Sequence, residues 1–338
     1  MAKAKQKVGS LFAGVGGICQ GFKNVGCQIT WANELDENSR KTYELNHAKT
    51  PFTKEHNVQF LTKDNTESVD ILTAGFPCQP FSQAGRALGF DDPRGHLFYD
   101  VTRLMRELRP KVIFLENVKN LATHDGGATF EIVREEIRKA NYSFIPFILK
   151  ASEYTHVPQG RERIYIVGFR DEPDFFYQKP IKINTDCRED SPLSSKFRIP
   201  KPVDGLPAPV ADFLESSTAD ESDFYSDPSS MIHKRVRECV TKAGVVYQYR
   251  RWFVRENKSN VCPTLTANMG LGGHNVPIVL DDPYPRRLSP KECFNLQGFK
   301  DFKVPGDVSR VHLYRQCGNS VVVPVVERIA KEIVRVLG

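Results

Sequence analysis

The chain has 338 residues, which is enough for one large domain and a smaller second one. Its composition, 40% hydrophobic and 26% charged, is that of a globular protein, and no apolar stretch approaches the roughly 20 residues of a membrane span. The basic N-terminus leads into a predicted strand without a cleavable apolar segment, so we expect a cytoplasmic protein.

The first half of the chain alternates short apolar runs with helical patterns, which is typical of a parallel α/β sheet in doubly wound order. The predicted strands are residues 8–12, 28–32, 69–74, 111–115, 142–150 and 163–169. The predicted helices are residues 17–24, 36–47, 97–108 and 130–140. Ligands of such sheets bind at the carboxyl ends of the strands.

The character of the sequence changes after residue 169. Residues 171–230 are rich in Pro, Ser and Asp, which predicts irregular structure, and residues 245–281 carry β-type runs. A helical pattern resumes at Ser289 and ends in a predicted helix over residues 321–337. We therefore expect a catalytic and cofactor-binding domain over 1–170, a smaller domain over 171–285, and a return segment, 286–338, that completes the first.

Charge is unevenly distributed over the smaller domain. Residues 203–227 hold seven acids and no Lys or Arg, whereas residues 228–280 hold eight Lys or Arg and two acids. The basic stretch, with Arg250 and Arg251 beside Trp252, fits contact with nucleic-acid phosphates and base edges. A solvated strand face with aromatic side chains turned inward fits this segment equally well.

The first glycine loop contains Gly14 and Gly16 and precedes a predicted helix. A dinucleotide fingerprint would have Gly or Ala at Cys19. Glu34 closes the next predicted strand, where an acid can accept hydrogen bonds from ribose hydroxyls. The pattern suits an adenosyl ligand without a pyrophosphate, such as S-adenosylmethionine, although a plain strand–turn–helix joint gives the same pattern.

Cys78 is the exceptional cysteine among the eight of the chain. No two cysteines form a CxxC pair, which argues against a structural metal site and a disulfide framework. Most of them are expected to be reduced and buried. Cys78 instead follows an apolar strand and lies between Pro77 and Pro80, whose fixed φ angles stiffen the loop. This context indicates a displayed nucleophile.

Further polar residues follow the later strands. Glu116 comes directly after a predicted strand of the same sheet, so it can share a crevice with Cys78, although a capping or ion-paired acid would have the same place. Arg161 and Arg163 alternate along a strand and would share one face, holding a phosphate, orienting Glu116 and a substrate carbonyl, or forming a surface ion-pair ladder. Asn319 or Ser320 would cap the last helix or contact a ligand.

Taken in this order, these segments resemble the DNA (cytosine-5) methyltransferases of bacterial restriction-modification systems. The segments that carry the resemblance are residues 12–16, 33–34, 75–82, 116–118, 159–169, 286–299 and 318–322. The segment between residues 169 and 286 then corresponds to the target-recognition domain, with Thr264 and Leu265 as its Thr-Leu landmark. The resemblance implies a Rossmann-like mixed sheet with helices on both faces, and an irregular or β-rich smaller domain.

The resemblance also implies the chemistry of the site. Cys78 would attack carbon 6 of a cytosine turned out of the duplex, Glu116 would bind ring nitrogen 3, and Arg163, with Arg161, would steady the base and Glu116. The expected contacts to S-adenosylmethionine are Phe12, Gly14, Gly16, Glu34, Pro77, Leu97, Asn319 and Ser320. The expected contacts to double-stranded DNA are Ser82, Arg94, Arg250, Arg251, Thr264 and Leu265.

Two positions depart from the family pattern. Leu35 stands where many members have an aromatic side chain that stacks on adenine, and Asn57 where an acid often binds the adenine amino group. The alternatives are an RNA methyltransferase, a catalytically inactive DNA-binding homologue and a nicotinamide oxidoreductase. The long basic insert disfavours the first, the joint presence of Cys78 and Glu116 the second, and Cys19 the third. We expect a monomer that pairs functionally with a restriction endonuclease.

Overall fold

The computed structural model describes residues 5–77, 97–171, 196–250, 253–257, 259–270 and 276–338. Its main sheet has six strands in the order β2-β1-β3-β4-β6-β5. They are β1 (Lys7–Leu11), β2 (Gln28–Ala32), β3 (Ile71–Gly75), β4 (Val112–Val118), β5 (Ile145–Lys150) and β6 (Glu162–Phe169).

The sheet is mixed, as the family resemblance implies. Strands β1 to β4 are parallel, whereas β6 runs antiparallel to both β4 and β5. The parallel arrangement that the sequence pattern indicated holds for β1 to β4 but not for β6. Residues 151–161 between β5 and β6 hold only the one-turn helix α5 (Ala151–Tyr154), which is too short for the crossover that a parallel pair needs.

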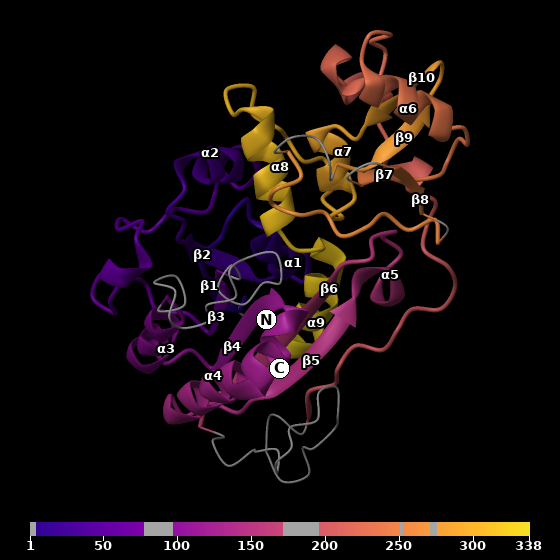
Figure 1. Ribbon diagram of the computed structural model, residues 1–338. Coiled ribbons are helices and arrows are strands. Elements are labelled where there is room, and N and C mark those ends of the chain that lie inside the picture. The colour runs from indigo at the N-terminus through magenta and orange to yellow at the C-terminus, as the bar shows by residue number, and fades with distance from the viewer. Residues whose placement is uncertain (1–4, 78–96, 172–195, 251–252, 258, 271–275) are drawn as a thin grey trace.

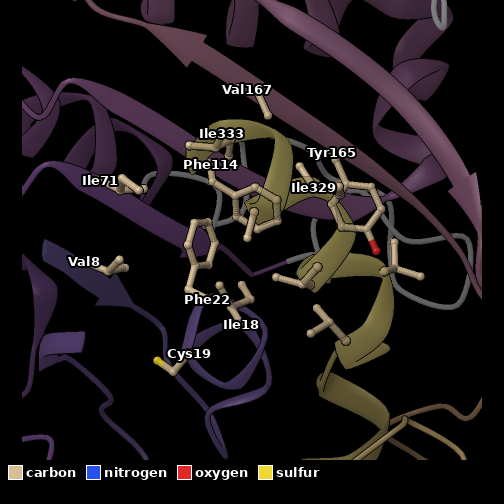
Figure 2. Packing of buried hydrophobic residues seen from close by; sticks show 14 of the residues in the cluster. Val8, Ile18, Cys19, Phe22, Ile71, Phe114, Tyr165, Val167, Ile329 and Ile333 are labelled. Carbon is tan, nitrogen blue, oxygen red and sulfur yellow. The ribbon is translucent and has the colours of Figure 1, made fainter. Parts of the chain in front are cut away.

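Helices cover both faces of this sheet (Figure 1). One face packs against α1 (Gly17–Asn24), α2 (Glu37–Asn46) and α9 (Val323–Leu337), and the other against α3 (Leu97–Leu108) and α4 (Ala128–Lys139). Alternate residues of β4 supply the two cores, because successive side chains of a strand point to opposite faces. Figure 2 shows the first core, where Phe22 of α1 meets Phe114 of β4 edge to face at 5.4 Å between ring centroids, beside Ile329 of α9.

The smaller part of the chain is built on an antiparallel sheet. Its order is β10 (Tyr284–Arg287), β9 (Ile278–Asp281), β7 (Tyr247–Arg250) and β8 (Phe253–Glu256), and α6 (Met231–Cys239) packs on it through Val236. Between the two sheets lie α7 (Pro290–Asn295) and α8 (Arg310–Asn319) (Figure 1). The described residues from 196 to 230 contain short 3-10 turns and irregular backbone, and Phe197 packs against the main sheet.

The beginning of the last helix differs from the prediction. Asn319 is the final residue of α8 and Ser320 its C-cap, whereas α9 begins at Val323 with Val322 as its N-cap, so neither Asn319 nor Ser320 caps α9. The reason is that residues 310–319 form a separate helix with its own N-cap, Ser309. Pro324 lies in the first turn of α9, as predicted, where a missing N–H costs nothing.

No helix among the described residues is long and apolar enough to cross a membrane. Within the same residues, no group of three or more His, Cys, Asp or Glu side chains is arranged to hold a metal ion. The described cysteines are free thiols, and all but Cys239 are buried.

A buried ion pair joins the smaller sheet to α7. Arg286 of β10 has no exposed surface, and its two terminal nitrogens each donate to one oxygen of Glu292 at 2.8 Å. Its Nε donates to Asp281 at 2.5 Å. Glu292, also fully buried, accepts the backbone N–H groups of Ser289 and Glu215 at 2.7 and 2.8 Å. Both charges are therefore fully hydrogen-bonded, as a buried pair requires.

Replacing Arg286 with methionine should lower the free energy of unfolding by about 3–5 kcal/mol, because Glu292 is left as an uncompensated buried charge. Urea denaturation measures the change. The double variant Arg286→Met, Glu292→Gln removes that charge and should recover part of the loss. A single variant within about 1 kcal/mol of the wild type would contradict this account.

Candidate active site

A cavity of about 360 Å³ opens at the carboxyl ends of β1 to β4, within the size range of ligand sites. Its lining comes from the residues after β1 and β2, the ends of β3 and β4, the beginning of β6, the first turns of α1 and α2, and α8. Because β6 is antiparallel, its first residues reach the same edge of the sheet as the last residues of its neighbours.

The glycine loop is held by the acid that closes β2. The two carboxylate oxygens of Glu34 accept the backbone N–H groups of Gly14 and Asp36, both at 2.8 Å. Burial raises the pKa of Glu34, and these hydrogen bonds oppose the rise. Gly16 has a φ of +89°, and a Cβ there would lie 2.2 Å from Nε2 of His47, so only glycine fits. Glu34 and Gly16 therefore fix the path of the loop.

The end of β3 is tied to the end of β4. Gly75 pairs in register with Glu116, and Nδ2 of Asn117 donates to the carbonyl of Phe76 at 3.2 Å. Pro77 lines the cavity and is the last described residue before Cys78. The predicted site residues Cys78, Ser82, Arg94 and Arg251 lie outside the described residues.

Glu116 and Arg163 form a nearly buried ion pair. The Nε atom of Arg163 lies 3.1 Å from Oε1 of Glu116, and the two side chains are 14% and 10% exposed. Burial raises the pKa of Glu116, and the positive charges of Arg163 and Arg161 oppose the rise without cancelling it. The cavity thus contains a carboxyl group that holds its proton more tightly than an ordinary glutamate.

Arg161 lies directly before β6 rather than on it and contacts backbone oxygens. Its guanidinium donates to the carbonyls of Leu265 at 2.9 Å and Gly318 at 3.0 Å, and also to that of Ser320. Arg161 is 3% exposed, and burial, assisted by the charge of Arg163, lowers its pKa to about 9. It joins the segment between β8 and β9 to the end of α8, and it lines the cavity beside Arg163.

The sequence model of the C-5 cytosine-specific DNA methylases matches residues 6–335. The chain belongs to this family. Type II methyltransferase M.Bsp6I of Bacillus sp. (strain RFL6) is 41% identical over 331 residues, which cover 97% of this chain and 98% of that relative. M.HhaI of Haemophilus parahaemolyticus is 33% identical over 347 residues, with coverages of 98% and 96%. The chain is thus a DNA cytosine-5 methyltransferase, and the resemblance seen in its sequence is confirmed.

Solved structures support the fold assignment. A mutant of DNMT2 from Spodoptera frugiperda superimposes with a TM-score of 0.70 at 22% identity, over 98% of this chain and 99% of that one. A putative DNA modification methyltransferase encoded within an Escherichia coli prophage gives a TM-score of 0.65, also at 22% identity, with the same coverages. At this identity the likeness concerns the fold, that of S-adenosylmethionine-dependent methyltransferases.

The cavity of this methyltransferase brings together most of the predicted site residues that the structure describes. Those that line it are Phe12, Gly14, Glu34, Pro77, Glu116, Arg161, Arg163, Asn319 and Ser320. Gly16, Leu97, Thr264 and Leu265 do not line it, and Arg250 lies at the exposed end of β7. Thr264 instead donates to the carbonyl of Gly160 at 3.0 Å, next to Arg161. Leu35, which departs from the family pattern, is 67% exposed.

The sequence analysis missed five polar residues that line the cavity. They are Asp36 and Ser39 at the beginning of α2, and His312, Arg315 and Gln316 on α8. The signal was available on α8, since residues 312, 315, 316 and 319 have the spacing of one helix face. The sequence analysis predicted a helix only from residue 321, so it did not recognise this face.

Gly318 lies where two segments cross without room for a side chain. A Cβ there would lie 2.2 Å from the backbone nitrogen of Ala267, so the backbone itself would have to move. Helix propensity alone would make alanine favourable in α8 by about 1 kcal/mol. The clash with the backbone of Ala267 outweighs this gain in helix propensity. Gly318→Ala should therefore lower the free energy of unfolding by at least about 2 kcal/mol, measured by urea denaturation. Gly306→Ala, whose Cβ meets nothing within 4 Å, is the matched control. A Gly318→Ala variant that is more stable than the wild type would contradict the close approach of these two segments.

The raised pKa of Glu116 predicts a pH dependence of stability. Because the folded-state pKa lies above the ordinary value of 4.5, the folded chain binds this proton more tightly than the unfolded chain. The free energy of unfolding of the wild type should therefore fall relative to that of Glu116→Gln as the pH rises from about 4.5 through the raised pKa. Urea denaturation over a pH series measures the difference, with the surface change Glu44→Gln as the control. A difference that stays constant with pH would contradict the prediction.

Proposed function

We propose that this methyltransferase transfers a methyl group from S-adenosylmethionine to carbon 5 of a cytosine turned out of duplex DNA, through a covalent bond between Cys78 and carbon 6. One observation carries the proposal. The Glu116–Arg163 pair and the loop held by Glu34 line one cavity with Pro77, the residue before Cys78. An acid whose pKa is raised by burial, a loop suited to an adenosyl ligand and the residue next to Cys78 therefore line one cavity.

The cavity fits S-adenosylmethionine, which supplies an activated methyl group when bound. A Cβ on Gly14 would meet nothing within 4 Å, so the backbone there is open to close approach by a ligand. Each oxygen of Glu34 accepts one backbone N–H and keeps a lone pair for a ribose hydroxyl. We assign the cofactor contacts to Phe12, Gly14, Glu34, Pro77, Leu97, Asn319 and Ser320, with Gly16 shaping the loop.

The types of residue at the site match the chemistry that methylation of cytosine at carbon 5 requires. Carbon 5 is a poor nucleophile until the Cys78 thiolate adds to carbon 6 and makes the ring an enamine. Glu116, whose pKa is raised by burial, would donate to ring nitrogen 3 so that negative charge does not accumulate on the ring. Arg163 holds the carboxyl group through Oε1 and steadies the base carbonyl, and Arg161 holds the segments around it. Once carbon 5 carries the methyl group, a water removes its proton, the double bond between carbons 5 and 6 re-forms, and the thiolate of Cys78 leaves.

The target carbon is inaccessible inside a duplex, so the base must leave the stack. We assign the DNA contacts to Ser82, Arg94, Arg250, Arg251, Thr264 and Leu265, with residues 171–285 as the target-recognition domain between the catalytic segments 1–170 and 286–338. One asymmetric recognition domain reads a short site without a twofold partner, so we propose a monomer. Methylation would protect host DNA in the cytoplasm from a matching restriction endonuclease.

The direct test uses labelled S-adenosylmethionine and duplex DNA of diverse sequence. We expect label at carbon 5 of cytosine, and sequencing of the methylated positions should return one short recognition sequence. Binding of S-adenosylmethionine without transfer to any duplex would overturn the proposal.

Cys78→Ser should lower turnover by about 10³-fold or more while leaving DNA affinity nearly unchanged, since the hydroxyl cannot form the nucleophile that adds to carbon 6. Duplexes that carry 5-fluorocytosine, whose carbon 5 has no proton to lose, should trap the wild type covalently and leave the variant untrapped. Cys239→Ser, at the exposed thiol of α6, is the control and should retain full turnover. Trapping of Cys78→Ser would remove Cys78 from the mechanism.

A further inference from the structure

Residues 262–265 of the smaller part of the chain are docked on residues 158–161, which lead into β6. The backbone N–H of Cys262 donates to the carbonyl of Pro158 at 2.7 Å, and the N–H of Gly160 donates to the carbonyl of Cys262 at 2.8 Å. This pair of hydrogen bonds forms a parallel β-bridge between the two segments. The two segments are therefore held in one register.

The side chain of Gln159 completes this contact. It has no exposed surface, and its Oε1 accepts the backbone N–H of Leu265 at 3.3 Å. Its Nε2 donates to the carbonyl of Leu296 at 2.6 Å and to Oε1 of Gln297 at 3.3 Å. Because both ends of the amide are paired, its orientation is fixed. One buried amide thus links residues 262–265 to the turn that follows α7.

Gln297 is a second buried amide of the same network, with different partners. It also has no exposed surface, and its Nε2 donates to the carbonyl of Cys317 at 2.9 Å. Its backbone carbonyl accepts the N–H of Val323 at 2.8 Å. No hydrogen bond within the described ranges joins Gln297 to residues 262–265. The two glutamines are alike in type and burial, and only Gln159 holds that segment.

Residues assigned to the reaction lie on both sides of the contact. Residues 262–265 include two of the assigned DNA contacts, and Arg163, the partner of Glu116, follows Gln159 at the beginning of β6. Arg161, between them, donates to the carbonyl of the same segment. Gln159 and Arg161 therefore set the position of the DNA-contacting segment relative to the ion pair in the cavity.

We propose that Gln159 is a positioning residue for methyl transfer, which holds residues 262–265 in register with the strand that carries Arg163. The inference rests on the proposed function, because it concerns the geometry in which the bound base meets Glu116. Gln159 does not line the cavity, so it acts through these neighbours and not by contact with a ligand. A misplacement of about 1 Å caused far from the reacting atoms can slow a reaction by roughly 10²-fold.

The test is the variant Gln159→Met, which has a side chain of similar length without the amide. In a single turnover with duplex and S-adenosylmethionine both saturating, the rate constant for methyl transfer should fall by about tenfold or more. The dissociation constants of the two ligands should stay within about twofold, because the groups assigned to bind them are retained. A loss of folded protein would lower the amplitude of the turnover, whereas the proposal predicts a lower rate constant.

Two further variants separate positioning from packing. Gln297→Met removes a neighbouring amide of equal burial, and it should keep the rate constant within about twofold of the wild type even if it unfolds at a lower temperature. Gln159→Glu retains an oxygen that can accept the N–H of Leu265, and it should recover most of the rate constant that Gln159→Met loses. Thermal unfolding of each variant without ligands shows how much of it is folded.

The other outcomes overturn the inference. An equal slowing of Gln159→Met and Gln297→Met would mean that the network acts through general packing, and a Gln159→Glu variant as slow as Gln159→Met would remove the contact with Leu265 as the cause. Weaker DNA binding with an unchanged rate constant would assign Gln159 to affinity. A wild type that methylates no duplex would overturn the proposed function as well, whereas an active wild type with an equally fast Gln159→Met overturns this inference alone.

Discussion

The cavity depends on the guanidinium of Arg161. One buried cation donates to the carbonyls of Leu265, Gly318 and Ser320, so the segment between β8 and β9, the end of α8 and the beginning of β6 meet at a single side chain. These carbonyl dipoles, with the charge of Glu116, compensate a cation whose pKa burial lowers to about 9. Arg163 lies two residues further on, so the same contact fixes the partner of Glu116.

Two opposing effects meet at Glu116. Burial favours the neutral acid, and the two arginines favour the carboxylate. The 3.1 Å contact with Arg163 holds one oxygen of Glu116 in place, and burial raises the pKa of this acid. The hydrogen bond from Asn117 to the carbonyl of Phe76 also ties the residue before Pro77 to the end of β4.

Local patterns were sufficient to predict much of the fold and of the site. The apolar strands, the helices between them and the acids Glu34 and Glu116 were all predictable, because a residue that follows a strand in sequence also follows it in space. The antiparallel direction of β6, the separate helix α8 and the contact of Thr42 with Gln316 were not. That contact joins residues 274 positions apart and depends on how α2 and α8 pack, which no local pattern encodes. The N-cap predicted at Asn319 or Ser320 was wrong because residues 310–319 form a separate helix, which ends before α9 begins.

Helix α8 contacts both halves of the chain through different faces. Arg310 pairs with the buried carboxylate of Asp223, and the hydroxyl of Tyr314 donates to the carbonyl of Leu288 at 2.6 Å, so one face is bound to the structure around the smaller sheet. The face with Arg315 and Gln316 lines the cavity. Separating Arg310 from Asp223 would strip the buried carboxylate of one of its two cations, the other being Arg287 at 3.4 Å. The structure around the smaller sheet and the cavity are therefore joined by direct contacts through this helix.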